Sequence, residues 1–328
     1  MTFTDETSRR SVLSTAIEST LFVIINVIAI VGNSFVIAAV LRNPTLRKMA
    51  NWYMLTLALA DLLVAVTCMP LTLGAAIKGQ WLYSDVTCQI QGHVIQIWAC
   101  FSLTTVAATA VHRYYRVIRP VRYREIFTKV FTISMVVSCL VLSTVVPVGM
   151  VLYLDARFQF GPHFFCTPNF HTQKSKPIAL TMFLGCIIIP STILLFCYFK
   201  VYRAVRRHVI LVVRNLRAQK HTHRSSEIKL SCRVEEINTT KLVFAIITVF
   251  CVLWIPMCII GALFVCGVFL PRWGHMIFDY LMFTTTATNP LIYGLMNKAF
   301  RAEYARIIGC KRRRSATDHI GKASVRQA

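Results

Sequence analysis

The chain has 328 residues, of which 56% are hydrophobic and only 15% are charged, and its mean hydropathy is +0.59. This composition is too apolar for an ordinary soluble domain. The formal net charge of +23 does not indicate nucleic-acid binding, because the basic residues are confined to short segments between long apolar runs. We therefore expect a membrane protein without a nucleic-acid partner.

Seven apolar runs each have about the length needed to cross a bilayer, since ~30 Å of hydrocarbon requires about 20 helical residues. They predict an all-α membrane protein, a seven-transmembrane helix bundle. Six runs contain no charged residue and the second contains one, Asp61. The runs are Ser19–Leu41, Met49–Ile77, Val86–His112, Val130–Leu154, Pro177–Phe199, Leu242–Pro271 and Tyr280–Asn297.

The Lys and Arg residues between the runs indicate the orientation. Of the 36 in the chain, 7 fall on the side of the N-terminus and 29 on the opposite side. Because cytoplasmic loops are enriched in these residues, we expect a multi-pass protein whose N-terminus is extracellular. Met1–Arg10 is polar and does not resemble a signal peptide. We divide the chain into an extracellular N-terminus (1–18), a membrane domain with an interfacial helix (19–309) and a cytoplasmic basic tail (310–328).

Asp61 is a functional candidate because a carboxylate near the middle of a bilayer costs several kcal/mol unless it is paired. Oxygen atoms of Ser102, Thr285 and Asn289 could surround it, and hard oxygen ligands suit a small cation such as sodium. We expect sodium here and no other metal. The alternative is a protonated Asp61 held by hydrogen bonds.

The third run ends in His112-Arg113-Tyr114. Twenty-five residues separate Cys88 from Arg113, or about 37 Å of helix, so the arginine lies at the cytoplasmic end. An arginine in this place often reaches lipid phosphates. Alternatively, Arg113 pairs with Glu236, which precedes the sixth run, and the pair holds helices three and six together.

The sixth run contains Phe250 and Trp254, which are four residues apart and share one helix face. Pro256 kinks the helix beside the tryptophan. Such a pair usually packs in a core, and a kink in this position is also where a rigid-body movement would pivot.

The seventh run contains Asn289-Pro290 and Tyr293. A proline inside a membrane helix frees a backbone carbonyl that needs another partner, which Asn289 can supply. Tyr293 lies one turn further towards the basic end. We expect a weakened joint here, suited to a bundle that changes shape.

An amphipathic interfacial helix is expected over Asn297–Ile308, where apolar and basic residues alternate at helical spacing. Cys310 follows it and could carry a palmitoyl anchor, or it could remain a free thiol. Two other cysteines, Cys88 and Cys166, lie in outer segments where disulfides form. Cys266 is a competing partner for either of them.

Several short motifs occur in a characteristic order between Ser19 and Cys310. Together they resemble the rhodopsin-like (class A) G-protein-coupled receptors. The sequence Ile292–Tyr304, and Gly79-Gln80-Trp81 before Cys88-Gln89, are similar to the melatonin-receptor-like branch. The motifs are Gly32-Asn33, Leu59-Ala60-Asp61, Cys88 with Cys166, His112-Arg113-Tyr114, Pro190 with Tyr198, Phe250 with Trp254-Ile255-Pro256, and Asn289-Pro290-Leu291-Ile292-Tyr293.

The resemblance implies a plasma-membrane receptor with a Cys88–Cys166 disulfide. It implies a small extracellular ligand, a heterotrimeric G protein and arrestin as partners, and contact with membrane lipids. The switch residues it assigns are His112, Arg113, Tyr114, Tyr198, Glu236, Asn289, Pro290 and Tyr293 for G-protein coupling, and Phe250, Trp254 and Pro256 for the toggle.

His112 departs from the family, which has an acid before the arginine. Without that acid, only a partner such as Glu236 would hold the closed state, and we expect ligand-free signalling. The alternative is that His112 forms a hydrogen bond with the second inner loop and so stabilises the inactive state differently.

The ligand pocket also departs from familiar patterns. Val148 and Cys186 replace an asparagine and a histidine that the melatonin branch uses, which argues against melatonin itself. Ile95 replaces the aspartate of amine receptors. Phe283 replaces the retinal-linking lysine of opsins, so no retinal cofactor is expected.

The remaining pocket is apolar with few polar groups, which suits a small and mostly neutral ligand. Its predicted residues are Ile95, Gln96, Ala99, Met182, Cys186, Trp254, Met257, Tyr280 and Phe283. A channel or transporter is the competing class, but we find no internal repeat of the kind that many transporters have. We expect no enzymatic activity, because no nucleophile and base lie at one membrane depth.

Overall fold

The structure is a computed structural model that describes residues 10–47, 49–154, 157–168, 183–218, 245, 248–264 and 266–309. Three residues singled out above, Met182, Glu236 and Cys310, lie outside these ranges. The expectations that concern them are therefore not addressed by the structure.

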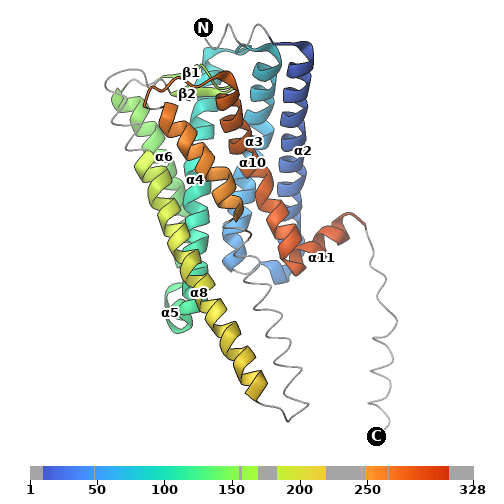
Figure 1. Ribbon diagram of the computed structural model, residues 1–328, viewed down its shortest axis with the longest axis vertical. Helices are drawn as coiled ribbons and strands as arrows, with labels where there is room; N and C mark the ends of the chain where they lie inside the picture. The colour runs from blue at the N-terminus through green and yellow to red at the C-terminus, as the bar shows by residue number, and fades with distance from the viewer. Residues whose placement is uncertain are drawn as a thin grey trace.

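Seven helices run side by side in the described part of the chain (Figure 1). Five of them are long and apolar enough to cross a membrane. The sixth is shorter in its described range, and the seventh carries polar residues. The predicted all-α bundle is confirmed. The helices are α2 (Val12–Arg42), α3 (Met49–Lys78), α4 (Asp85–Ile118), α6 (Lys129–Leu154), α8 (Ile189–Ala218), the unlabelled helix Thr248–Phe264 and α10 (Arg272–Met296).

The two ends of the bundle differ (Figure 1). One end carries the antiparallel hairpin of β1 (Phe158–Phe160) and β2 (Cys166–Pro168), and we call it the disulfide end. The other end carries the short helices η1 (Pro44–Leu46), α5 (Pro120–Ile126) and α11 (Lys298–Ile307), and we call it the α5–α11 end. Helix α11 turns away from α10, as expected for an interfacial helix, and it matches the predicted range within one residue at each end.

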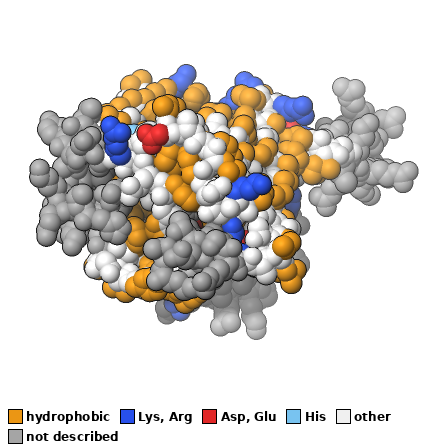
Figure 2. Space-filling view, turned by 90° about the horizontal axis from the view of Figure 1, so that it is seen from above, with side chains coloured by type: hydrophobic (Ala, Val, Ile, Leu, Met, Phe, Trp, Pro, Cys, Tyr) orange, Lys and Arg blue, Asp and Glu red, His pale blue; other side chains and the backbone are white. Residues whose placement is uncertain are grey.

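Helix α4 is the centre of the bundle, because it contacts α3, α6 and α8 as well as both strands. Its inward residues Ile95, Trp98 and Leu103 are buried in the core. Many apolar side chains face outwards instead, and Figure 2 shows them around the rim when the bundle is seen from the disulfide end. An apolar rim of this kind suits a lipid environment.

Helix α2 begins at Val12, seven residues before the predicted run, so the predicted boundary at residue 18 falls inside the helix. The Ser11 hydroxyl caps the helix by accepting the N–H of Ser14 at 3.1 Å. The first turns carry a charge, Glu18, which pairs with Arg10 and with Arg272 of α10. Because these ion pairs satisfy the carboxylate, the helix extends beyond the charge-free stretch that a hydropathy reading detects.

Candidate functional site

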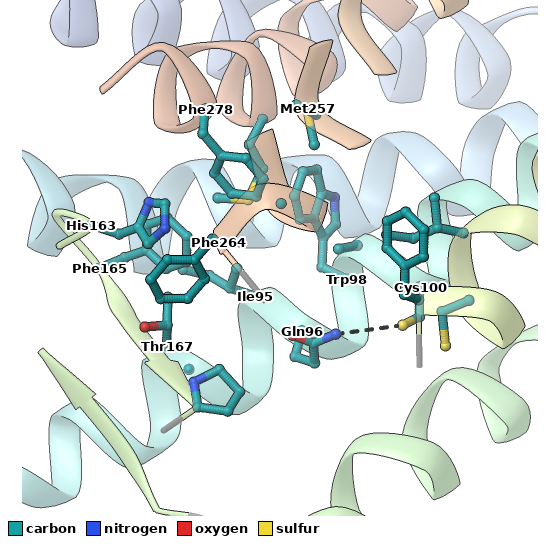
Figure 3. A pocket seen from close by; sticks show the side chains of 18 of the residues that line it. Ile95, Gln96, Trp98, Cys100, His163, Phe165, Thr167, Met257, Phe264 and Phe278 are labelled. Carbon is teal, nitrogen blue, oxygen red and sulfur yellow. Dashed lines mark hydrogen bonds between the residues drawn. The ribbon is translucent and has the colours of Figure 1, made fainter. Parts of the chain in front are cut away.

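A cavity of about 190 Å³ lies between α4, the π-helical turn η2 (Phe183–Ile188), Thr248–Phe264 and α10 (Figure 3). Its walls are mostly apolar and aromatic, with polar side chains from Gln96, His163, Thr167 and Thr285. Six of the predicted pocket residues line it: Ile95, Gln96, Ala99, Cys186, Trp254 and Met257. Since a cavity with few convergent polar groups is the usual form of a small-molecule site, we take it as the candidate ligand site.

The hairpin closes the cavity at the disulfide end. The predicted disulfide is present, with 5.5 Å between the Cα atoms of Cys88 and Cys166. The amide of Gln89 accepts the backbone N–H of Phe158 at 3.0 Å and donates to its carbonyl at 2.6 Å. A Cβ at Gly92 would lie 2.1 Å from the Phe158 ring. Only glycine therefore allows β1 to pack this closely on α4.

Two predicted pocket residues, Tyr280 and Phe283, do not line the cavity and pack against α2. The Phe22 ring lies 4.8 Å from Tyr280 and 5.8 Å from Phe283, measured between centroids. The Tyr280 hydroxyl also donates to the Glu18 carbonyl at 3.1 Å. These two residues thus join α10 to α2 in this structure, and α10 instead lines the cavity with Phe278, Met282 and Thr285.

A buried hydrogen-bonded pair at the disulfide end, Asp279 and His163, was missed by the sequence reasoning. Asp279 of α10 is fully buried, and its Oδ1 lies 2.6 Å from Nδ1 of His163 in the hairpin. Asp61 is therefore not the only fully buried carboxylate among the described residues. Asp279 falls one residue before a charge-free run, and its partner lies 116 residues away in a loop, so no local signal joins the two.

Trp254, together with Leu103 and Thr285, lines both this cavity and a second one of about 50 Å³. Phe250 stacks on it with 5.8 Å between ring centroids and 19° between ring planes. The second cavity reaches Asn289, beside Pro290 of α10. A change in the conformation of the Trp254 side chain would therefore alter the walls of both cavities.

Asp61 is fully buried, and two N–H donors bind its carboxylate. The Trp98 indole donates to Oδ1 at 2.8 Å, and the Asn289 amide donates to Oδ2 at 3.0 Å. Ser102, Thr285 and Asn289 all line the smaller cavity, whereas Asp61 is not part of its lining. The structure thus brings three of the four predicted residues to one cavity and joins the fourth, Asp61, to it through Asn289. A cation at Asp61 would compete with the Trp98 or Asn289 donor, and the sodium site remains a prediction.

The family of the chain follows from its similarity to known proteins. The model of the 7 transmembrane receptor (rhodopsin family) matches residues 32–293, which is most of the chain. The chain belongs to the rhodopsin family of seven-transmembrane receptors. It is accordingly a G-protein-coupled receptor and a multi-pass protein of the plasma membrane.

Relatives of the receptor are known in sequence and in structure. Melatonin receptor type 1C of Gallus gallus is 29% identical over 86% of this chain and 79% of its own length. Melatonin receptor type 1A of Ovis aries is 27% identical over 86% of this chain and 74% of its own length. The crystal structure of squid rhodopsin aligns with a TM-score of 0.76 at 18% identity, covering 90% of this chain and 86% of that one. The predicted resemblance is therefore confirmed.

His112 of the receptor lies inside the bundle at the α5–α11 end, with 1% of its surface exposed. Its Nε2 is 3.0 Å from the hydroxyl of Tyr123 in α5, the segment that the sequence predicts to be the second inner loop. Rings of Tyr53, Tyr123 and Phe127 surround it at centroid distances of 5.7, 5.1 and 5.0 Å. The hydrogen bond of the alternative hypothesis is present, whereas its effect on signalling remains a prediction.

The other switch residues surround α4 at the same end. Tyr198 of α8 is buried and packs in one apolar cluster with Tyr114. Tyr114 packs against the Phe196 ring at 6.5 Å. The proposed partner Glu236 lies outside the described residues, so the Arg113–Glu236 pair remains a prediction.

Proposed function

We propose that the receptor binds a small, mostly neutral extracellular ligand other than melatonin in the 190 Å³ cavity, and signals to a heterotrimeric G protein at its α5–α11 end. In this proposal the N-terminus and the disulfide end are extracellular. The distribution of Lys and Arg supports this orientation, since most of them belong to the segments at the α5–α11 end.

The position of Trp254 is the observation that carries the proposal. Trp254 lines both the ligand cavity and the smaller cavity near Asn289. A ligand that presses on Trp254 would therefore favour one packing of Thr248–Phe264 against α10. Packed interfaces of this kind change between discrete arrangements, which is how a local contact reaches a distant site.

Further partners follow from the surface of the α5–α11 end. Helix α11 buries Phe300 and exposes Arg301, which suits an interface between lipid headgroups and acyl chains. We propose that palmitoylation of Cys310 adds an anchor there, and that arrestin is a second intracellular partner. We propose neither enzymatic activity nor covalently bound retinal, since Phe283 takes the place of the linking lysine.

The experiment tests both the orientation of the receptor in the membrane and its coupling to a G protein. An epitope tag before Met1 should be accessible to antibody on intact cells. The purified receptor in lipid nanodiscs should accelerate nucleotide exchange on at least one class of Gα subunit. Arg113→Ala should abolish this acceleration while leaving the yield of folded protein unchanged.

Two results would contradict the proposal. A tag accessible only after permeabilisation would reverse the orientation. A lack of exchange on every Gα class, with and without a small-molecule library, would remove the coupling. Ion or solute flux through liposomes that contain the protein would favour the transporter or channel class instead.

A further inference from the structure

His163 and Thr167 are the two polar side chains that the hairpin contributes to the cavity, and His163 is the more informative of the two. It lies between β1 and β2, its side chain is 5% exposed, and it lines the cavity. Figure 3 shows it grouped with Phe165, Phe264 and Phe278 at one end of the site. Centroid distances from its ring to these three rings are 5.4, 5.7 and 5.0 Å.

Asp279 fixes the proton arrangement of this histidine. One carboxylate oxygen is 2.6 Å from Nδ1 of His163, and the other accepts the backbone N–H of Phe164 at 3.0 Å. An ionised carboxylate is only an acceptor, so we assign the proton to Nδ1. In the neutral ring Nε2 then carries a lone pair. Within the described part of the chain Nε2 has no hydrogen-bond partner.

The surroundings of Nε2 select the kind of ligand. The neighbouring walls are aromatic rings, which pack well against a flat ring. A carboxylate-bearing ligand would approach the negative charge of Asp279, and an ammonium-bearing ligand would find that carboxylate already bonded to His163 and Phe164. A neutral aromatic ligand with one N–H or O–H group is not repelled by the Asp279 carboxylate and does not need to pair with it.

We propose that His163, oriented by Asp279, accepts a hydrogen bond from the ligand, and that the ligand is a neutral, mainly apolar aromatic molecule with one N–H or O–H donor. This inference rests on the proposed function, because it assumes that the cavity is the ligand site. His163 is then the residue that determines specificity for a donor, and Asp279 is a positioning residue.

Matched fragments provide the test without knowledge of the natural ligand. Indole is compared with 1-methylindole, and 2-naphthol with 2-methoxynaphthalene, so that each pair differs mainly in the presence of a donor. Binding to the full chain in nanodiscs is titrated by saturation-transfer NMR, with empty nanodiscs subtracted. The donor member of each pair should bind about tenfold more tightly, as expected for one buried hydrogen bond.

Three variants test whether His163 and Asp279 are responsible for the preference for the donor fragment. The double variant His163→Phe with Asp279→Leu removes both partners, so that no buried charge is left alone, and should abolish the preference. Asp279→Asn can donate to Nδ1 and so allow the opposite tautomer of His163, which should reduce the preference or reverse it. His275→Phe is the matched control, because the His275 ring lies 4.8 Å from His163 but does not line the cavity. It should retain the preference.

Fragment binding tests the role of His163, and nucleotide exchange tests the proposed function separately. An equal or inverted preference in the wild-type receptor overturns the inference, as does a preference that persists in both the double variant and Asp279→Asn. If the double variant does not fold, Asp279→Asn alone decides. Absence of binding by all four fragments at millimolar concentration also overturns it. Nucleotide exchange on G proteins, measured on the same wild-type preparation, reports independently on whether the proposed function stands.

Discussion

The hydrogen bond between His112 and Tyr123 offers a direct test of how the receptor stays inactive. Tyr123→Phe removes one hydroxyl and keeps the ring that stacks on Phe127 at 5.2 Å. We expect this change to raise ligand-free signalling, because it removes the hydrogen bond that joins α5 to α4.

The size of the effect follows from burial. With 1% of His112 exposed, water cannot readily replace the lost hydroxyl, and an unsatisfied buried group costs about 1–3 kcal/mol. If the bond exists only in the closed state, the equilibrium between closed and open states shifts towards the open state by about 5- to 150-fold. A receptor whose open state is populated at about 1% would then show a clear rise in basal activity.

The assay is ligand-free nucleotide exchange by purified receptor in nanodiscs at matched concentration. Tyr53→Phe is the control, because Tyr53 packs on the same histidine at 5.7 Å between ring centroids, while its hydroxyl bonds to the Met135 sulfur at 3.5 Å. It should leave basal exchange near the wild-type level. Thermal unfolding of both variants shows whether a general loss of stability is responsible.

Two results would refute this reasoning. Equal basal exchange in Tyr123→Phe and the wild-type receptor would mean that the bond does not distinguish the two states. An equal rise in Tyr53→Phe would point to loosened packing around His112 instead. His112→Asp tests the hypothesis of the missing acid, because it restores a carboxylate beside Arg113 and is expected to lower basal exchange.

The remaining predictions concern the disulfide, the Asp61 site and the joint between α2 and α10. Cys88→Ala and Cys166→Ala should reduce surface expression to a similar degree, because the bond closes a loop with a separation of 78 residues, worth about 4–5 kcal/mol in chain entropy; normal expression of either variant would contradict this. If sodium binds Asp61, Asp61→Asn should abolish the difference in thermal stability between sodium and choline buffers, and Trp98→Phe should enlarge it by freeing Oδ1; equal sodium sensitivity in the wild type and Asp61→Asn would place the site elsewhere. Glu18→Gln should lower the free energy of unfolding by about 1–3 kcal/mol, because it weakens two ion pairs at a carboxylate with 12% exposure, and an unchanged melting temperature would show that these pairs add nothing.

The sequence alone determined the architecture of the receptor, because the bilayer imposes a simple rule on composition. Each span must be apolar over about 20 residues, so the seven runs were visible without tertiary information. Motifs whose residues all lie in one helix could also be predicted from the sequence. Phe250 and Trp254 share a face because of helix periodicity alone, and α11 alternates apolar and basic residues along ten positions.

The tertiary structure decided everything that depends on partners far apart in the chain. His163 gains its orientation from Asp279, and Asp61 gains a donor from Trp98, across separations of 116 and 37 residues. Such pairs leave no periodic trace in the sequence, since each residue is locally an ordinary loop or helix position. The direction of Tyr280 and Phe283 likewise follows from how α10 packs on α2. Helix rotation of this kind is set by side-chain packing between helices, which hydropathy does not encode.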